Sequence, residues 1–262
     1  MKNLLIIAFL LGAMSCQKAQ RDEDTATNTA EDVSVAQAVF SDAYKIIRAV
    51  ALETKGISSS STTMASLFGC DDITVDTISN PKKITIDFKY IGCEGLNVAR
   101  YGRLIGEFYG EFPLENSAVD LSFSNYYFQD YEANGKVRVI FKADNASGNA
   151  QHSFYVQSGK VTDDNSDILW TASHVWEVQE NGNAETNFVI RGNSNGVNRK
   201  GNVFFSEIKS PIQSTSSCVY PVKGSRELEV INLSNRLAVY QSTSCKNEGV
   251  VIVNGSSVPF VY

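Results

Sequence analysis

Histidines, carboxylates and cysteines are the side chains through which this sequence could do chemistry, and few of them stand at a catalytic spacing. His152 and His174 are the only histidines among the 262 residues, which is too few for most catalytic and metal sites built on imidazole. No H-E-x-x-H, P-loop or G-x-G-x-x-G motif occurs. The sequence therefore predicts no catalytic residue, and we expect the protein not to be an enzyme.

Cys16 ends a short apolar segment that begins at Leu4. The segment has about half of the roughly 20 residues that a membrane-spanning helix needs, but it suits the apolar region of a signal peptide. The run Ala13-Met14-Ser15-Cys16 resembles a bacterial lipobox, in which the chain is cleaved before the cysteine and the cysteine is acylated. Residues 1–15 are thus predicted to be a lipoprotein signal peptide. Cys16 is predicted to carry the acyl chains, such as palmitate, that hold the protein on a membrane.

The segment after Cys16 is polar and has no hydrophobic period, so residues 16–34 are predicted to be the lipidated cysteine and a disordered tether. The acidic cluster Asp22-Glu23-Asp24 resembles the export signal of Bacteroidetes-type surface lipoproteins. We therefore expect a lipid-anchored protein of the bacterial outer membrane, exposed at the cell surface. The alternative is that the acidic segment is merely a solvated linker.

Four cysteines remain after Cys16, and an even number in an exported protein favours disulfides. Three pairings are possible, and local closure favours Cys70 with Cys93 and Cys218 with Cys245. The alternative is a zinc site, but the cysteines lack the C-x-x-C spacing that is typical of such sites.

Asp163, Asn165 and Asp167 have the D-x-N-x-D spacing that opens an EF-hand calcium loop. The next residue is Ile168 where that loop needs glycine, and His174 stands where it needs its closing glutamate. We therefore expect an ordinary polar hairpin turn, with a weak calcium site as the alternative. The sequence suggests no other cofactor.

Residues 35–262 are predicted to form one domain that starts with a helix over Val35–Glu53, capped by Ser34. Its apolar residues recur at steps of three and four, which places them on one face. The opposite face carries polar residues such as Gln37, Asp42 and Lys45 and is predicted to face solvent. We expect the apolar face to pack on the rest of the domain.

From Ile73 onward the hydrophobic period is two, which predicts an antiparallel all-β domain, either a sandwich or a large curved sheet. No helical pattern separates the strands, so parallel crossovers are not expected. Turns are predicted at Asn134-Gly135, Ser158-Gly159, Asn181-Gly182, Asn195-Gly196, Gly224-Ser225 and Asn254-Gly255. The strands are expected at Ile84–Phe88, Leu104–Phe112, Val119–Phe128, Lys136–Lys142, Ser153–Gln157, Ile168–Val178, Ala184–Arg191, Asn202–Ile208, Val219–Val222, Leu228–Ile231, Leu237–Gln241, Val250–Val253 and Val258–Tyr262.

Trp170, His174 and Trp176 share one side of the predicted strand Ile168–Val178, because side chains alternate along a strand. Core packing is the favoured interpretation, with His174 a neutral, hydrogen-bonded imidazole. The alternative is an exposed aromatic platform on which Trp170 and Trp176 bind a glycan.

A set of segments gives the chain a resemblance to a known group of proteins. They are Lys83-Ile84-Thr85-Ile86-Asp87-Phe88, Gly92-Cys93, Phe123-Ser124-Asn125-Tyr126-Tyr127, the two tryptophans on one strand, Arg191-Gly192-Asn193-Ser194-Asn195-Gly196, and Cys218 with the terminal Cys245 hairpin. With them, the mature domain resembles an uncharacterised family of β-rich Bacteroidetes-type outer-membrane and surface lipoproteins. The resemblance implies a location and a fold, and it supplies no catalytic residue.

The overall charge bears on the class of partner. The formal net charge is −6, so nucleic-acid binding, which needs a basic surface, is not expected. The predicted partner is the membrane, through the lipid on Cys16. Beyond it, we expect a non-enzymatic binding or adhesion module for a glycan or an envelope protein. The alternative is a structural accessory subunit of an outer-membrane complex.

Overall fold

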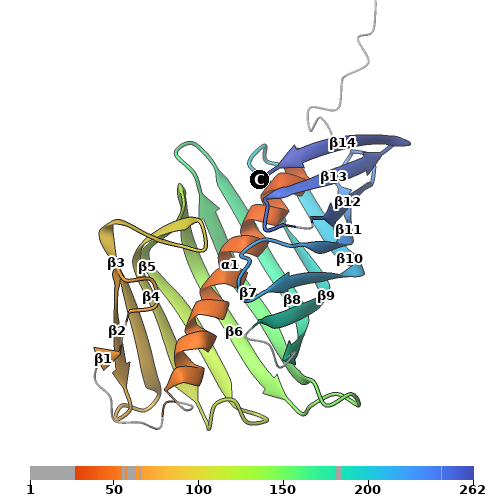
Figure 1. The fold of residues 1–262 in the computed structure, drawn as a ribbon. Coiled ribbons are helices and arrows are strands. Elements are labelled where there is room, and N and C mark those ends of the chain that lie inside the picture. The colour runs from red at the N-terminus through yellow and green to blue at the C-terminus, as the bar shows by residue number, and fades with distance from the viewer. Residues whose placement is uncertain (1–26, 55–56, 58–62, 65, 181–184, 243) are drawn as a thin grey trace, which may run out of the picture.

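The computed structural model describes residues 27–54, 57, 63–64, 66–180, 185–242 and 244–262. They form one helix and one antiparallel sheet of 14 strands, and the helix lies across the concave face of the sheet (Figure 1). The elements are α1 (Asn28–Glu53), β1 (Thr63–Met64), β2 (Asp71–Asp76), β3 (Lys82–Gly95), β4 (Val98–Tyr109), β5 (Ala118–Phe128), β6 (Tyr131–Lys142), β7 (Ala150–Thr162), β8 (Asp167–Glu180), β9 (Thr186–Val197), β10 (Val203–Thr215), β11 (Lys223–Val230), β12 (Arg236–Gln241), β13 (Glu248–Val253) and β14 (Ser256–Val261).

Each strand pairs with its neighbours in the chain, so the sheet is a continuous meander from β1 to β14. The two end strands do not pair with each other, and the sheet stays open. The prediction of a single antiparallel β domain with one N-terminal helix is confirmed, and the curved sheet rather than the sandwich is the form that it takes. The sheet wraps around α1 so far that the helix lies against both β3 and β14.

The curvature comes from irregularities inside long strands, several of which we expected to be turns. The register shifts at Asn134-Gly135 in β6 and at Ser158-Gly159 in β7, so both predicted turns are wrong. The backbones meet so closely there that a Cβ on Gly135 would lie 2.8 Å from the Cα of Gly159. Bulges of this kind increase the local twist and bend a sheet. At these two positions glycine therefore marks a close approach of two backbones and not a chain reversal.

The other predicted turns have mixed outcomes. Asn254-Gly255 is a true hairpin turn, and both residues have the positive φ of a type I′ turn. Asn195-Gly196 lies inside β9 and Gly224-Ser225 inside β11, so those predictions are wrong. Asn181-Gly182 lies outside the described residues. Val219–Val222 was expected to be a strand, but β11 begins only at Lys223 and these four residues form part of a largely buried loop.

Helix α1 begins at Asn28, seven residues earlier than its sequence pattern predicts. The predicted boundary between tether and domain at residue 34 is therefore wrong, because Asp32 and Ser34 are already buried in the helix. Its polar face is not solvent-exposed either, since Gln37, Asp42 and Lys45 are buried. A sheet that curls around both sides of a helix buries polar positions that a flat sheet would leave in water.

The core lies between the concave face of the sheet and the helix. Phe40 of α1 stacks on Trp170, and Tyr44 meets Trp176 edge to face, with ring centroids 5.6 and 5.5 Å apart. All four side chains are essentially inaccessible to solvent. Aromatic pairs in these geometries add to the burial of apolar area, so the middle of α1 is held firmly on β8.

Candidate functional site

Trp170 and Trp176 do not form a binding platform. Both lie on the inner face of β8 with at most 1% of their surface exposed, so the predicted core packing is confirmed and the glycan platform is wrong. His174, between them, is also buried, and burial lowers its imidazole pKa to about 3, which keeps it neutral. Its expected hydrogen bond is wrong, because neither ring nitrogen has a partner among the described residues.

The segment Asp163–Asp167 forms the polar hairpin turn between β7 and β8 that the sequence predicts. The carboxylate of Asp163 accepts hydrogen bonds from the backbone N–H groups of Asn165 and Ser166, at 3.0 and 2.9 Å. Asp167 pairs with Lys160, 2.8 Å away. The carboxylates of Asp163 and Asp167 are thus engaged with protein donors, which favours the hairpin-turn interpretation over the calcium site.

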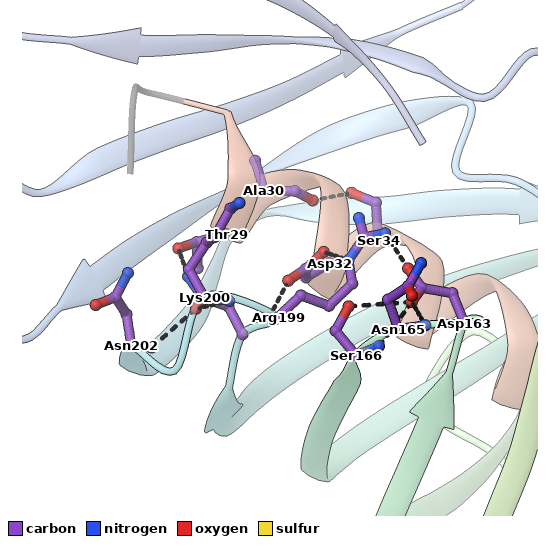
Figure 2. Close-up of polar contacts among 11 residues, drawn as sticks. Thr29, Ala30, Asp32, Ser34, Asp163, Asn165, Ser166, Arg199, Lys200 and Asn202 are labelled. Atoms are coloured by element: carbon purple, nitrogen blue, oxygen red, sulfur yellow. Dashed lines mark hydrogen bonds and ion pairs between the residues drawn. The ribbon is translucent and has the colours of Figure 1, made fainter. Parts of the chain in front are cut away.

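Arg199 connects this turn to the helix. It lies between the start of α1 and the β7–β8 turn, and it binds Asp32 at 2.6 Å and Asp163 at 2.8 Å (Figure 2). Burial raises the pKa of Asp163, but the bonds from Arg199 and from the turn outweigh it and lower that pKa to about 2. The cluster fastens the helix N-terminus to the sheet, which is a structural role.

Both predicted disulfides are present, one near the N-terminal strands of the sheet and one near its C-terminal strands. Cys70 pairs with Cys93 beside β3, and Cys218 pairs with Cys245 near the C-terminal strands. Within the described ranges, the one cluster of metal-binding residue types is Cys70, Asp71 and Cys93. Its two sulfur atoms are joined to each other, so the cluster offers no thiolate to a metal.

Gly192–Gly196 reads G-x-S-x-G, the pattern of a hydrolase nucleophile, and our sequence prediction did not use it. In that pattern the serine stands on a sharp turn between a strand and a helix. Here Ser194 lies inside β9, opposite Ser206 of β10, and its side chain is buried. The motif is therefore part of the sheet and not a nucleophile elbow.

The candidate site is an apolar pocket of about 340 Å³ on the side of α1 that faces away from the sheet floor. We call it the mouth pocket, because it is enclosed by α1 and by segments from both lips of the sheet. Its size and mostly apolar lining are those of a small-molecule site. It is lined by Asp42, Lys45, Ile46, Arg48, Ala49, Leu52, Leu67, Phe68, Leu96, Thr186, Phe188, Ser216, Cys218 and Val219.

Lys45 is the unusual group of this pocket. Its ammonium donates hydrogen bonds to the backbone carbonyls of Thr215 and Cys218, at 3.0 and 2.9 Å, and lies 5.2 Å from the centre of the Phe188 ring. It is not within ion-pair distance of any carboxylate in the described part of the chain. Burial lowers the pKa of Lys45 to about 7, and the charge of Asp42 only partly opposes this.

Asp42 does not neutralise Lys45, because its carboxylate is paired with a second cation. The carboxylate of Asp42 is bound by Nε and Nη2 of Arg100, each at 2.7 Å, and both side chains are buried. Arg48 also lines the pocket, with its guanidinium carbon 5.8 Å from the centre of the Phe188 ring. Because Arg48 is itself paired with Glu180 at 3.1 Å, Lys45 is the cation of the pocket lining that has no carboxylate partner among the described residues.

Little in the sequence pointed to this site. Asp42, Lys45 and Arg48 looked like a solvated helix face, and their burial depends on segments that lie more than 130 residues away in the chain, such as those that carry Thr215 and Glu180. Arg100 sits in a strand between Ala99 and Tyr101, and no pattern marks it as a buried partner of Asp42. An uninterrupted meander of this length, long enough to wrap a helix, was the one available hint.

Within the described part of the chain, no helix combines the length and the hydrophobicity that crossing a lipid bilayer requires. Cys16 and the rest of the predicted signal peptide lie outside the described residues. Comparison of the chain with protein-family models, with curated proteins and with solved structures found no match.

Proposed function

We propose that this protein is a lipid-anchored protein of the cell envelope that binds a small amphiphilic anion in the mouth pocket. The observation that carries the proposal is Lys45, a buried cation that borders an apolar pocket and has backbone carbonyls in place of a carboxylate partner. A buried charge without a counter-ion is costly, and an anionic ligand would supply the counter-ion.

The pocket matches the two parts of such a ligand. Ile46, Leu67 and Phe68 offer apolar surface to a hydrocarbon body. Lys45 lies beside the Phe188 ring, and its ammonium offers a charge-assisted hydrogen bond to a carboxylate. A medium-chain carboxylate such as decanoate combines these features, so we use it as the probe.

The location in the envelope rests on the sequence. The apolar segment that ends at Cys16, the polar tether and the resemblance to Bacteroidetes-type surface lipoproteins support an acylated anchor at the outer membrane. Two disulfides in the domain agree with export from the cytoplasm. A membrane-tethered binding protein is well placed to meet amphiphilic molecules, because these concentrate at membranes.

Binding of decanoate to the mature domain, followed by calorimetry, tests the pocket. We expect saturable binding with one site, and decanol, which lacks the charge, should bind at least tenfold more weakly. Lys45→Met should remove the preference for decanoate over decanol. Ala49→Trp, at an exposed position of the pocket wall, should block both ligands with little change in melting temperature.

The outcomes separate the parts of the proposal. Equal affinity for decanoate and decanol would reject the anion, and binding that survives Ala49→Trp would reject the mouth pocket. The anchor has its own test in the native host. Cys16→Ala should abolish incorporation of labelled palmitate, and unchanged labelling would overturn the lipoprotein assignment.

A further inference from the structure

A second pocket, of about 420 Å³, lies at the C-terminal end of α1, and we call it the end pocket. The last turns of the helix form one wall, with Arg48 and Leu52. The facing walls come from the β6–β7 hairpin and from the end of β8. We infer that the end pocket binds a neutral, polyhydroxylated small molecule of about the size of a monosaccharide, at a site distinct from the mouth pocket.

His152 is the first observation behind this inference. His152 is one of the residues that line the end pocket and is 1% exposed, yet neither of its ring nitrogens has a hydrogen-bond partner in the described structure. Buried polar side-chain atoms nearly always have a partner, and an exception calls for an explanation. A ligand in the pocket whose wall His152 forms would provide one.

Two further polar groups without described partners belong to rings that lie next to the His152 ring. They are the hydroxyl of Tyr44 and the indole N–H of Trp176, both fully buried. The ring of Tyr44 lies 5.1 Å from that of His152, and the ring of Trp176 lies 5.8 Å from it. Polar groups of three elements thus gather at one place, where an apolar core would have been expected.

The chemistry of these groups selects a neutral partner. Burial lowers the pKa of His152 to about 3, so at neutral pH its ring has one N–H donor and one acceptor nitrogen. Burial also raises the pKa of Tyr44, which therefore keeps its hydroxyl proton. Such a mixture of uncharged donors and acceptors complements hydroxyl groups, which both donate and accept.

The rim of the end pocket supports the same choice. Arg48 is paired with Glu180 at 3.1 Å, and the rim also carries one cation and one anion, Lys142 and Asp144. Positive and negative charges are therefore balanced, in contrast to the mouth pocket.

The two histidines of the chain provide the test, because His174 is an internal control. It is buried and lacks described partners like His152, but it does not line the end pocket. We would record the imidazole resonances of the ¹⁵N-labelled mature domain during titration with glucose, galactose or N-acetylglucosamine. At least one sugar should shift the His152 signals in a saturable way and leave those of His174 in place.

Several results would overturn the inference. They are no shift with any of the three sugars, equal shifts at both histidines, or a larger His152 shift with decanoate or inorganic phosphate than with the sugars. Substitution gives an independent check. His152→Phe keeps a ring in place and should weaken binding of the active sugar at least tenfold, whereas His174→Phe should not.

Should His152→Phe fail to fold, the titration of the parent decides alone, because it needs no variant. An unmoved His152 signal in that titration would reject the site. Failure of decanoate to bind the mouth pocket would not affect this result, because the two proposals use different probes and different variants.

Discussion

Asp42 of α1 and Arg100 of β4 form a buried, two-pronged ion pair across the interior of the curved sheet, with both N···O distances at 2.7 Å. Burial lowers the pKa of Arg100, but the charge of Asp42 outweighs this effect and raises it. We expect Asp42→Asn to lower the free energy of unfolding by about 3–5 kcal/mol, because it leaves the guanidinium buried without its counter-charge. Urea denaturation measures this directly.

An exposed pair of the same kind serves as the control. Asp87 and Arg103 lie 2.6 Å apart on the outer face, and each side chain is about half exposed. Asp87→Asn should cost about 1 kcal/mol or less. Equal losses for the two variants would contradict the structural role assigned to Asp42.

The buried histidines should make the protein sensitive to acid. Burial lowers the pKa of His152 and of His174 from 6.5 to about 3. Below pH 6.5 these imidazoles therefore become protonated in the unfolded chain while they stay neutral in the folded chain. Each histidine should therefore reduce stability by up to about 1.4 kcal/mol per pH unit as the pH falls from 6 to 4. Denaturant melts at several pH values in this range should show that the unfolding free energy of His174→Phe falls less steeply with decreasing pH than that of the parent. A slope identical to that of the parent would contradict its burial as a neutral ring.

Lys45 should make the stability of the protein depend on pH in a higher range, above pH 7. Its pKa is lowered from 10.5 to about 7 by burial, so between these values the unfolded chain holds a proton that the folded chain lacks. Stability of the parent, relative to Lys45→Met, should then rise with pH by up to about 1.4 kcal/mol per unit between pH 7 and 9. Parallel stability curves for the two proteins would show that Lys45 is not desolvated. Decanoate should bind with uptake of a proton at pH 8, which calorimetry in buffers of different ionisation enthalpy detects.

The tryptophan fluorescence should report a dry core. Trp170 and Trp176 are at most 1% exposed, so iodide should quench their emission in the unfolded protein and hardly in the folded one. Trp170→Ala should cost about 3–5 kcal/mol. The adjacent Leu169 faces outward and is 44% exposed, so Leu169→Ala should cost well under half as much. Similar losses for the two variants would place β8 in the wrong orientation.

The β character, the inner face of β8 and the two disulfides could be read from the sequence, because each depends on local period or on residue counting. Strand ends were harder to predict, because Asn134-Gly135 is typical of a turn whether the chain reverses there or bulges. What decides between the two is the backbone of Gly159 on the neighbouring strand, which a local pattern does not contain.

The candidate site could not be predicted from the sequence for a related reason. Whether Lys45 faces water depends on residues 215–218 closing over it, and whether Asp42 is free depends on Arg100. Both facts arise from how far the sheet curls. The orphan nitrogens of His152 likewise become visible only once Tyr44 and Trp176 have been placed around them.

The place of α1 at the start of the chain has a consequence for the order of folding. Neighbouring strands can pair as soon as they are synthesised, because the loops that join them are short and their closure costs little entropy. The helix cannot complete its contacts so early, because Ser34 shares a hydrogen bond with Tyr240, 206 residues further on. We therefore expect α1 to dock last, so that a newly synthesised chain exposes the aromatic inner face of its sheet until β12 and the strands after it have joined.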